Sequence, residues 1–310
     1  MEEILCSLHN YTKFSGYPYS FYNMAQEALD CGLDAVITTD KNIFPVGHNQ
    51  YYYRSEKKLM VVCGEELFDP LNDEIQHYLS VGIDREQFNK DVGNAQDEIL
   101  ILMDLKSPSL KSRYYELINA EDILYKGLKH SLPAIRKNIE QFDTLLLSDQ
   151  RCVGLAGTCS SSFQTKNTYA ELFSTVCNHL LVNDDFSGDI GHDSNILFKA
   201  IRKGNLFFSL DGLMDSKGFR FLAEGNNQDS VALPGDTIHL QNSITLKIRI
   251  PEACTCKLIH NGAIIKEWRQ CKQIPFVIYE PGYYRVECAL QIKRDFYDWI
   301  FTNPIYVRKG

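Results

Sequence analysis

Residues 5–40 read LCSLHNYTKFSGYPYSFYNMAQEALDCGLDAVITTD, and this stretch decides the fold that the sequence predicts. It begins with an apolar run that ends at His9, and a turn rich in Gly, Pro and Ser follows. An amphipathic helix is expected at 21–31, since Ser20 can cap its first turn. A second apolar run closes the stretch at Asp40. This order predicts a strand, a crossover helix and a parallel strand.

Two polar residues stand at the carboxyl ends of these predicted strands. They are His9 and Asp40. Parallel α/β sheets and barrels place ligands and catalytic groups at that edge, because the loops that leave it vary while the strands hold the geometry. We therefore expect a functional site around these two residues.

Composition and charge narrow the class of protein. The 310 residues are enough for a large core and a second small domain, and 44% apolar with 23% charged residues is an ordinary globular composition. Forty acids against 32 bases give a net charge of −8, which disfavours nucleic-acid binding. The first residues lack the basic region of a signal peptide, and no apolar run approaches the ~20 residues of a membrane span. We expect a soluble, cytoplasmic protein with no membrane contact.

The ten cysteines lie mostly inside apolar runs, which favours reduced core residues. Cys254 and Cys256, with Cys271 and Cys288 further on, form the cluster that could bind a metal. Its spacing matches no common zinc knuckle, and alternate residues of a strand share one face anyway. We favour a structural role for this cluster.

The segments that contain His9 and Asp40 also carry a family resemblance. Residues 8–12 (LHNYT) and 39–42 (TDKN) resemble the opening of the PHP (polymerase and histidinol phosphatase) superfamily. Members of that superfamily begin with Leu-His-x-His-Thr and reach Thr-Asp-His-Asn one helix later. The resemblance covers roughly residues 4–210 and implies a distorted (β/α)7, TIM-like barrel of the PHP type.

The resemblance implies a set of metal ligands for the hydrolysis of phosphate esters. His9 matches the first histidine of the family, and Glu65, after the apolar run 59–63, matches a bridging carboxylate. His77 matches a further histidine ligand, with Asp40 expected to orient a neighbouring group. In the same way, Glu116 and Asn119 resemble a Glu-x-x-Asn motif of the family.

Other ligand positions of the family are substituted here. Tyr11 and Lys41 stand where the second and third histidines are expected, and Cys159 and Ser161 replace an acid and a histidine. The run 99–103 lacks the His-Pro pair that completes a metal site in the family. A hydrolytic metal cluster needs several ions with about three or four protein ligands each, so the remaining residues are too few for it.

Two of the substituted residues have alternative interpretations. The Lys41 ammonium can replace the charge of a metal ion by pairing with Glu65 or Asp40, or it can be a solvated loop cation. Cys159 can be a nucleophile activated by a nearby Lys or His, or a small buried filler, and we favour the filler. His48, His179 and His192 are histidines from elsewhere in the chain that could supply replacement metal ligands.

The pattern of apolar residues in the sequence changes near 219. About eight short apolar segments follow, with turn signals at 261–262 and 281–282. This pattern predicts a small all-β, immunoglobulin-like sandwich. The expected domains are a barrel at 1–215 and a sandwich at 216–310.

Three functions are consistent with these patterns. The first is a catalytically degenerate, phosphoesterase-like protein with a binding or scaffolding role. The second is a divergent metal-dependent phosphoesterase that hydrolyses a small phosphate ester with a reduced site at His9, Glu65 and His77. In the third, the sandwich binds a protein or a glycan and the barrel is its mount.

These functions imply different ligands. We expect either no cofactor or one weakly held divalent metal, which would be Zn, Mn or Fe. The expected ligand is a small phosphorylated molecule, or a protein partner that binds through the sandwich. The expected pocket is lined by Tyr11, Asp40, Lys41, Cys159 and Ser161, with the tyrosine run 51–53 at its mouth.

Overall fold

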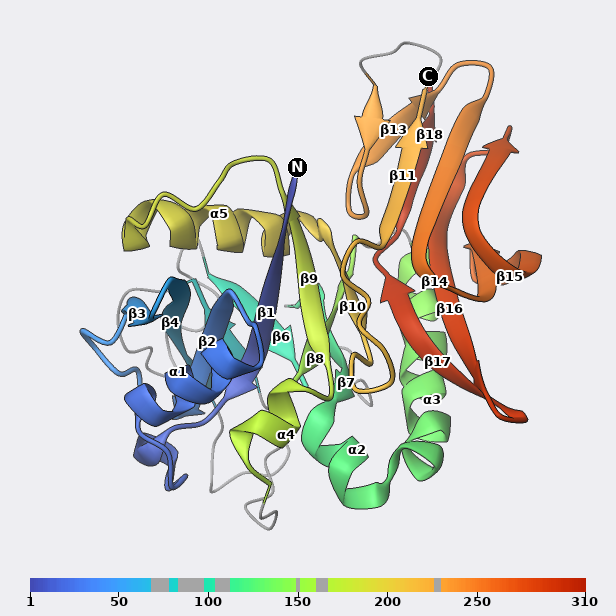
Figure 1. Ribbon diagram of the computed structural model, residues 1–310. Coiled ribbons are helices and arrows are strands. Elements are labelled where there is room, and N and C mark those ends of the chain that lie inside the picture. Colours follow the sequence, from blue (N-terminus) through green and yellow to red (C-terminus); the bar gives the residue numbers. More distant parts are fainter. Residues whose placement is uncertain (68–77, 83–97, 104–111, 149–150, 160–166, 226–229) are drawn as a thin grey trace.

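The computed structural model describes residues 1–67, 78–82, 98–103, 112–148, 151–159, 167–225 and 230–310 (Figure 1). These residues form 18 β-strands, five α-helices and one 3-10 helix. The strands are β1 Glu2–Asn10, β2 Ala35–Lys41, β3 Gln50–Arg54, β4 Lys57–Leu67, β5 Tyr78–Val81, β6 Ile99–Leu102, β7 Tyr114–Asn119, β8 Val153–Gly157, β9 Cys177–Val182, β10 Leu206–Ser209, β11 Arg220–Glu224, β12 Val231–Ala232, β13 Thr237–Leu240, β14 Ile244–His260, β15 Ala263–Ile278, β16 Gly282–Ile292, β17 Asp295–Thr302 and β18 Ile305–Lys309. The helices are η1 Lys13–Ser15, α1 Phe21–Asp30, α2 Ala120–Lys126, α3 Leu128–Leu147, α4 Tyr169–Phe173 and α5 Ile190–Lys203.

The first 41 residues fold as the sequence predicts. Strand β1 pairs in parallel with β2, and α1 connects them. The Ser20 side chain caps α1 by accepting from the Asn23 backbone N–H. Met24, Ala25 and Ala28 are buried, which explains why this face of the helix lies on the sheet.

The expected (β/α)7, TIM-like barrel is wrong. A barrel of that class needs parallel strands with a helix between each pair. Here β9 runs antiparallel to β1, and β3 and β5 both run antiparallel to β4. Strand β6 is antiparallel to β5, whereas β7 and β8 return to parallel pairing. The chain is mostly β, and its strands form one mixed sheet whose pairings close on themselves.

The expected small immunoglobulin-like sandwich is also wrong, because the C-terminal strands continue the same sheet. Strand β10 pairs with β9 on one side and with β17 on the other. Strands β14 and β15 are 17 and 16 residues long, which is longer than the short segments that the sequence predicts, and their pairing is irregular near Cys254. The predicted turn at 261–262 is confirmed, with positive φ at Asn261 and Gly262.

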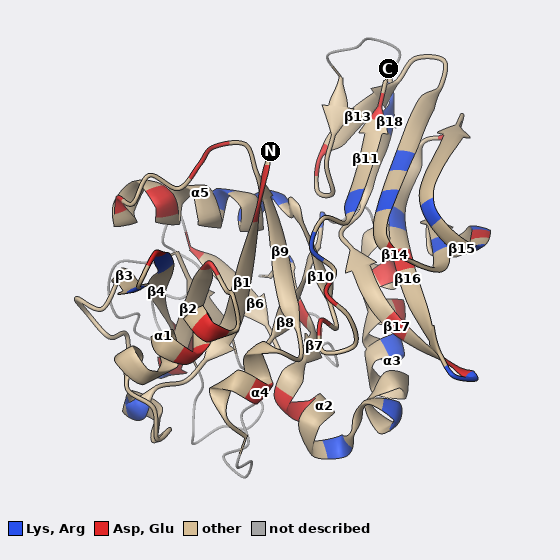
Figure 2. Ribbon diagram, viewed as in Figure 1, with Lys and Arg blue, Asp and Glu red and all other residues tan. Residues whose placement is uncertain are grey.

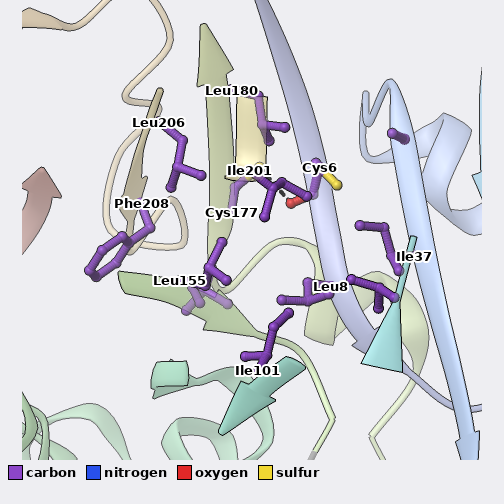
Figure 3. Close-up of a cluster of buried hydrophobic side chains, with 14 of the residues drawn as sticks. Cys6, Leu8, Ile37, Ile101, Leu155, Cys177, Leu180, Ile201, Leu206 and Phe208 are labelled. Atoms are coloured by element: carbon purple, nitrogen blue, oxygen red, sulfur yellow. Dashed lines mark hydrogen bonds between the residues drawn. The ribbon is translucent and has the colours of Figure 1, made fainter. Parts of the chain in front are cut away.

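Two buried apolar clusters form the core. Side chains from the N-terminal strands, including Leu8, Ile37 and Leu155, converge in the first cluster (Figure 3). The second cluster lies on the C-terminal strands, but Phe207 of β10 belongs to it, and Phe301 of β17 belongs to the first. Helix α3 also joins the two parts of the chain, since it lies beside β17 (Figure 1). The domain boundary at 215/216 stays a prediction.

None of the helices in the described segments is long and apolar enough to cross a membrane.

Candidate functional site

His9 lies at the end of β1, where its ring is enclosed by polar side chains. Its Nδ1 atom lies 2.7 Å from Oε2 of Glu116, and its Nε2 atom lies 2.9 Å from the Tyr11 hydroxyl. That hydroxyl donates in turn to the Glu66 carboxylate. All four side chains are buried, and His9 has a φ of 64°, which is rare for a residue other than glycine. Strained backbone of this kind concentrates at functional sites.

The sheet register decides which glutamate faces His9. In the pairing of β2 with β4, Asp40 lies opposite Glu65 and Lys41 lies opposite Glu66. Adjacent residues of a strand point to opposite faces, so the contact of Glu66 with Tyr11 directs Glu65 to the other face, which it shares with Asp40. The described residues therefore bring Glu66, rather than Glu65, to His9.

Glu116 of β7 is held in place from two sides. Asn119 donates from its Nδ2 to Oε1 of Glu116 at 2.8 Å, and to the Cys159 carbonyl at 2.5 Å. Gly157 of β8 lies against the carboxyl group, and a Cβ atom there would collide with it. The glycine thus creates the space from which Glu116 reaches His9.

The contacts of His9 determine its protonation. Burial acts to lower the pKa of His9, but the Glu116 and Glu66 carboxylates outweigh it and raise the pKa to about 9. Burial and the neighbouring Glu66 keep the pKa of Tyr11 well above its usual value. At neutral pH the site therefore holds a phenol and an imidazolium between two glutamates. An imidazolium has no lone pair for a metal ion.

Lys41 and Asp40 take different places near this group. The Lys41 ammonium lies 5.0 Å from the centre of the Tyr11 ring. Burial lowers the pKa of Lys41, while Glu66 and Glu121 act in the opposite direction. The Asp40 carboxylate accepts hydrogen bonds at 2.7 Å from the Thr12 backbone, the Thr12 hydroxyl and the Ser15 hydroxyl. Asp40 thus anchors the loop that follows β1.

Cys159 is fully buried at the end of the segment after β8. Burial raises the pKa of its thiol to about 12, so the thiol is protonated at neutral pH. A protonated thiol is a weak nucleophile, which favours the interpretation of Cys159 as a buried filler. His77 and Ser161, two further predicted site residues, lie outside the described residues.

A second polar cluster lies on β9, where it meets the segment after β10. Within the described residues, the group that could hold a metal ion is Cys177, His179 and Asp211, whose ligand atoms lie within 4.8 Å of one another. The mixed sulfur, nitrogen and oxygen donors suit zinc. In this structure His179 contacts Glu3 through Nδ1 at 2.8 Å and Asp211 through Nε2 at 3.1 Å.

The charges of this second cluster already balance without a metal. Burial acts to lower the pKa of His179, but its neighbours Cys177, Asp211 and Glu3 raise it well above its usual value. Glu3 also pairs with Arg220 of β11. The residues offer metal donors, but the bonding seen here is that of a buried ion-pair network that ties β1 and β9 to β11.

Comparisons with known proteins find a distant structural similarity and no match in sequence. No family model matches the chain, and no curated protein matches its sequence. A solved structure similar to it is that of a two-domain protein containing a predicted PHP-like metal-dependent phosphoesterase from Bacteroides vulgatus. The two chains share 11% sequence identity and a TM-score of 0.46, over 97% of this chain and 95% of the other.

Sequence reasoning missed Glu66 and Gly157. Two consecutive acids, Glu65 and Glu66, end the same apolar run, and the sequence alone does not fix which of them faces the core. Gly157 is visible in the sequence as a glycine at the end of a predicted strand. Its role depends on its contact with Glu116 in the adjacent strand, which the sequence does not show.

Proposed function

We propose that this chain is a phosphoesterase-like protein that does not hydrolyse phosphate esters at the His9 site and acts by binding. The observation that carries the proposal is the bonding of His9, because both ring nitrogens are engaged, one with Glu116 and the other with Tyr11. Metal-dependent hydrolysis would need a neutral imidazole at this position.

The protonation of His9 supports the proposal in energetic terms. A metal ion at Nε2 would have to displace the Tyr11 hydroxyl and remove a proton from a group whose pKa is about 9. Removing that proton at pH 7 costs roughly 3 kcal/mol, before the loss of the hydrogen bond to Tyr11 is counted. A metal would have to recover this free energy from its other ligands.

The balance of charge at the site also supports binding without metal catalysis. Two carboxylates, Glu66 and Glu116, face the imidazolium of His9, and the Lys41 ammonium lies over the Tyr11 ring. These two cations compensate the carboxylates from within the protein, as a divalent ion would do in a metal site. The negative charge of Glu66 and Glu116, which would attract a metal ion, is therefore largely neutralised by His9 and Lys41.

The experiment combines metal analysis with an activity assay. We expect the wild-type protein, purified without chelator, to hold less than one equivalent of zinc, manganese or iron in a form that depends on His9. We also expect no hydrolysis of p-nitrophenyl phosphate with added Mn²⁺ or Zn²⁺. A stoichiometric metal that is lost in His9→Gln would contradict the proposal.

Two further variants locate any metal that is found. His179→Gln tests the cluster on β9, since His179 belongs to the group that could hold an ion there. His239→Gln is the matched control, because His239 is exposed on β13. Metal lost in His179→Gln alone would assign the ion to the β9 cluster and would leave the His9 site without one.

A further inference from the structure

A basic pocket lies at the opposite ends of the strands that carry the His9 site. It has a volume of about 340 Å³ and lies where β7 and β8 begin, beside the C-terminal end of α5 and the start of β13. Among the described residues, its lining includes four cations, Arg113, Arg151, Arg202 and Lys203, and one acid, Asp236. Figure 2 shows basic residues at this end of α5. The whole chain, by contrast, has a net charge of −8.

Asp236, the acid among the described residues of the lining, is hydrogen-bonded within its own part of the chain. Oδ2 of Asp236 accepts from the Leu233 backbone N–H at 3.0 Å, and Oδ1 accepts from Nδ2 of Asn205 at 3.1 Å. These bonds use the carboxylate to shape the loop before β13. The described lining holds four cationic side chains and one carboxylate.

Arg151 is held in a fixed orientation in the pocket. Its guanidinium lies 5.2 Å from the centre of the Tyr306 ring, and it donates to the Thr237 hydroxyl. Tyr306 is buried and so offers a rigid surface. A guanidinium has five N–H donors in a planar fork, so most of them remain for a ligand with paired oxygens.

The two walls of the pocket are in direct backbone contact. Gly235, with a φ of 87°, lies so close to the Lys203 carbonyl that a Cβ atom at this position would collide with it. The Gly235 N–H donates to the Pro304 carbonyl at 2.7 Å, which fixes the loop to the strand end before β18. The pocket is therefore formed in advance of binding, which lowers the entropic cost of holding a ligand.

The end of α5 explains only part of the charge. Arg202 and Lys203 lie in the last turn of the helix, where cations interact favourably with the helix dipole. Arg113 and Arg151 precede strands β7 and β8 and have no such role. Their side chains nevertheless line the same concave surface.

We propose that this pocket binds a small soluble ligand that carries a phosphate or pyrophosphate group. Arg151 makes the bidentate contact with the phosphate oxygens, and the other cations supply the field around it. Tyr114 and Val153 offer an apolar surface for the uncharged part of the ligand. The volume lies at the lower end of the ~300–1,000 Å³ range of ligand pockets, which suits a small phosphorylated metabolite rather than a polymer. The inference goes beyond the proposed function, because none of these residues belongs to the His9 site.

The test is calorimetric titration of the full chain with inorganic pyrophosphate at low ionic strength. We expect binding with a Kd below about 1 mM. Arg151→Gln should weaken it at least tenfold, and Arg151→Lys should recover part of the affinity, since lysine keeps the charge but not the fork. Arg54→Gln is the matched control, because Arg54 is a half-exposed arginine that pairs with Asp30 and does not line the pocket.

A second pocket variant keeps the test decisive. Arg113 is exposed, so Arg113→Gln should fold normally and should also weaken binding several-fold. The thermal unfolding midpoint of each variant shows whether it is folded. Equal affinity in wild type, Arg151→Gln and Arg113→Gln would overturn the proposal, and so would the absence of binding to wild type. A loss of affinity in Arg54→Gln as large as in the pocket variants would overturn it as well.

Discussion

Nδ1 of His9 lies 2.7 Å from Oε2 of Glu116, and both side chains are buried at the edge where β1 and β7 end. This contact joins residues 107 positions apart in the sequence. It also fixes the imidazole as a cation, because Glu116 acts together with Glu66 to raise the pKa of His9 to about 9. The chemistry of the site depends on this pair.

The first prediction concerns stability and pH. The pKa of His9 is about 9 in the folded protein and near its usual value of 6.5 in the unfolded chain, so the folded state binds the proton more tightly. The contribution, up to roughly 3 kcal/mol, is fully present below pH 6.5 and is lost as the pH rises through 9. Urea unfolding of wild type and His9→Gln between pH 6 and pH 10 measures the difference in their free energy of unfolding at each pH. A difference between the two proteins that does not change with pH would contradict this assignment.

The second prediction concerns the glycine behind Glu116. In Gly157→Ala the new methyl group occupies the space of the Glu116 carboxyl group and forces it away from His9. We expect a loss of about 2–4 kcal/mol in the free energy of unfolding, because the displaced carboxylate and the imidazolium both lose a buried partner. The pKa of His9, followed by NMR titration, should fall toward its usual value.

Gly191→Ala is the control for this variant. Gly191 lies in the first turn of α5, and the nearest atom to an added Cβ there is the Asp189 Oδ1 at 3.4 Å. Alanine should be tolerated there, with a change within about 1 kcal/mol. If Gly157→Ala changed neither stability nor the His9 titration, Glu116 would not be held as the structure has it.

The third prediction concerns the hydroxyl between His9 and Glu66. Tyr11→Phe removes the hydroxyl that accepts from Nε2 of His9 and donates to Glu66. The variant should lose about 1–3 kcal/mol of unfolding free energy, since two buried polar groups lose a partner. Tyr22→Phe is the control, because Tyr22 is exposed on α1 and its hydroxyl should contribute little. Equal stability of the two variants, measured by chemical unfolding, would argue against the bridging hydroxyl.

Local patterns in the sequence predicted the local structure well. The strand, helix and strand of the first 41 residues depend on contiguous apolar runs and on the Ser20 cap, and both features are visible in the sequence. The direction of later strands is not. An apolar run such as 177–182 reads the same whether it pairs in parallel or, as β9 does with β1, in antiparallel fashion. The predicted barrel failed for this reason.

The predicted C-terminal sandwich is wrong because the pattern of short apolar segments does not show where a strand continues through an irregular stretch. Pro251 and Glu252 suggest the end of a strand, yet β14 continues through them because its pairing with β15 tolerates irregular register there. At the candidate site, His9 could be found from its position after an apolar run. The sequence could not show that Glu66 rather than Glu65 faces His9, because this depends on the register in which β4 pairs with β2.

The final prediction concerns the attachment of α3 to the C-terminal strands. Arg285 of β16 contacts both carboxylate oxygens of Asp143 in α3, at 2.7 and 2.5 Å, and both residues are buried. Arg285→Gln leaves the Asp143 carboxylate without its cation, and we expect a loss of about 3–5 kcal/mol. Arg54→Gln removes an exposed pair with Asp30 and should cost at most about 1 kcal/mol. Chemical unfolding of both variants measures the contrast. Similar losses would mean that this pair does not fasten α3 to β16.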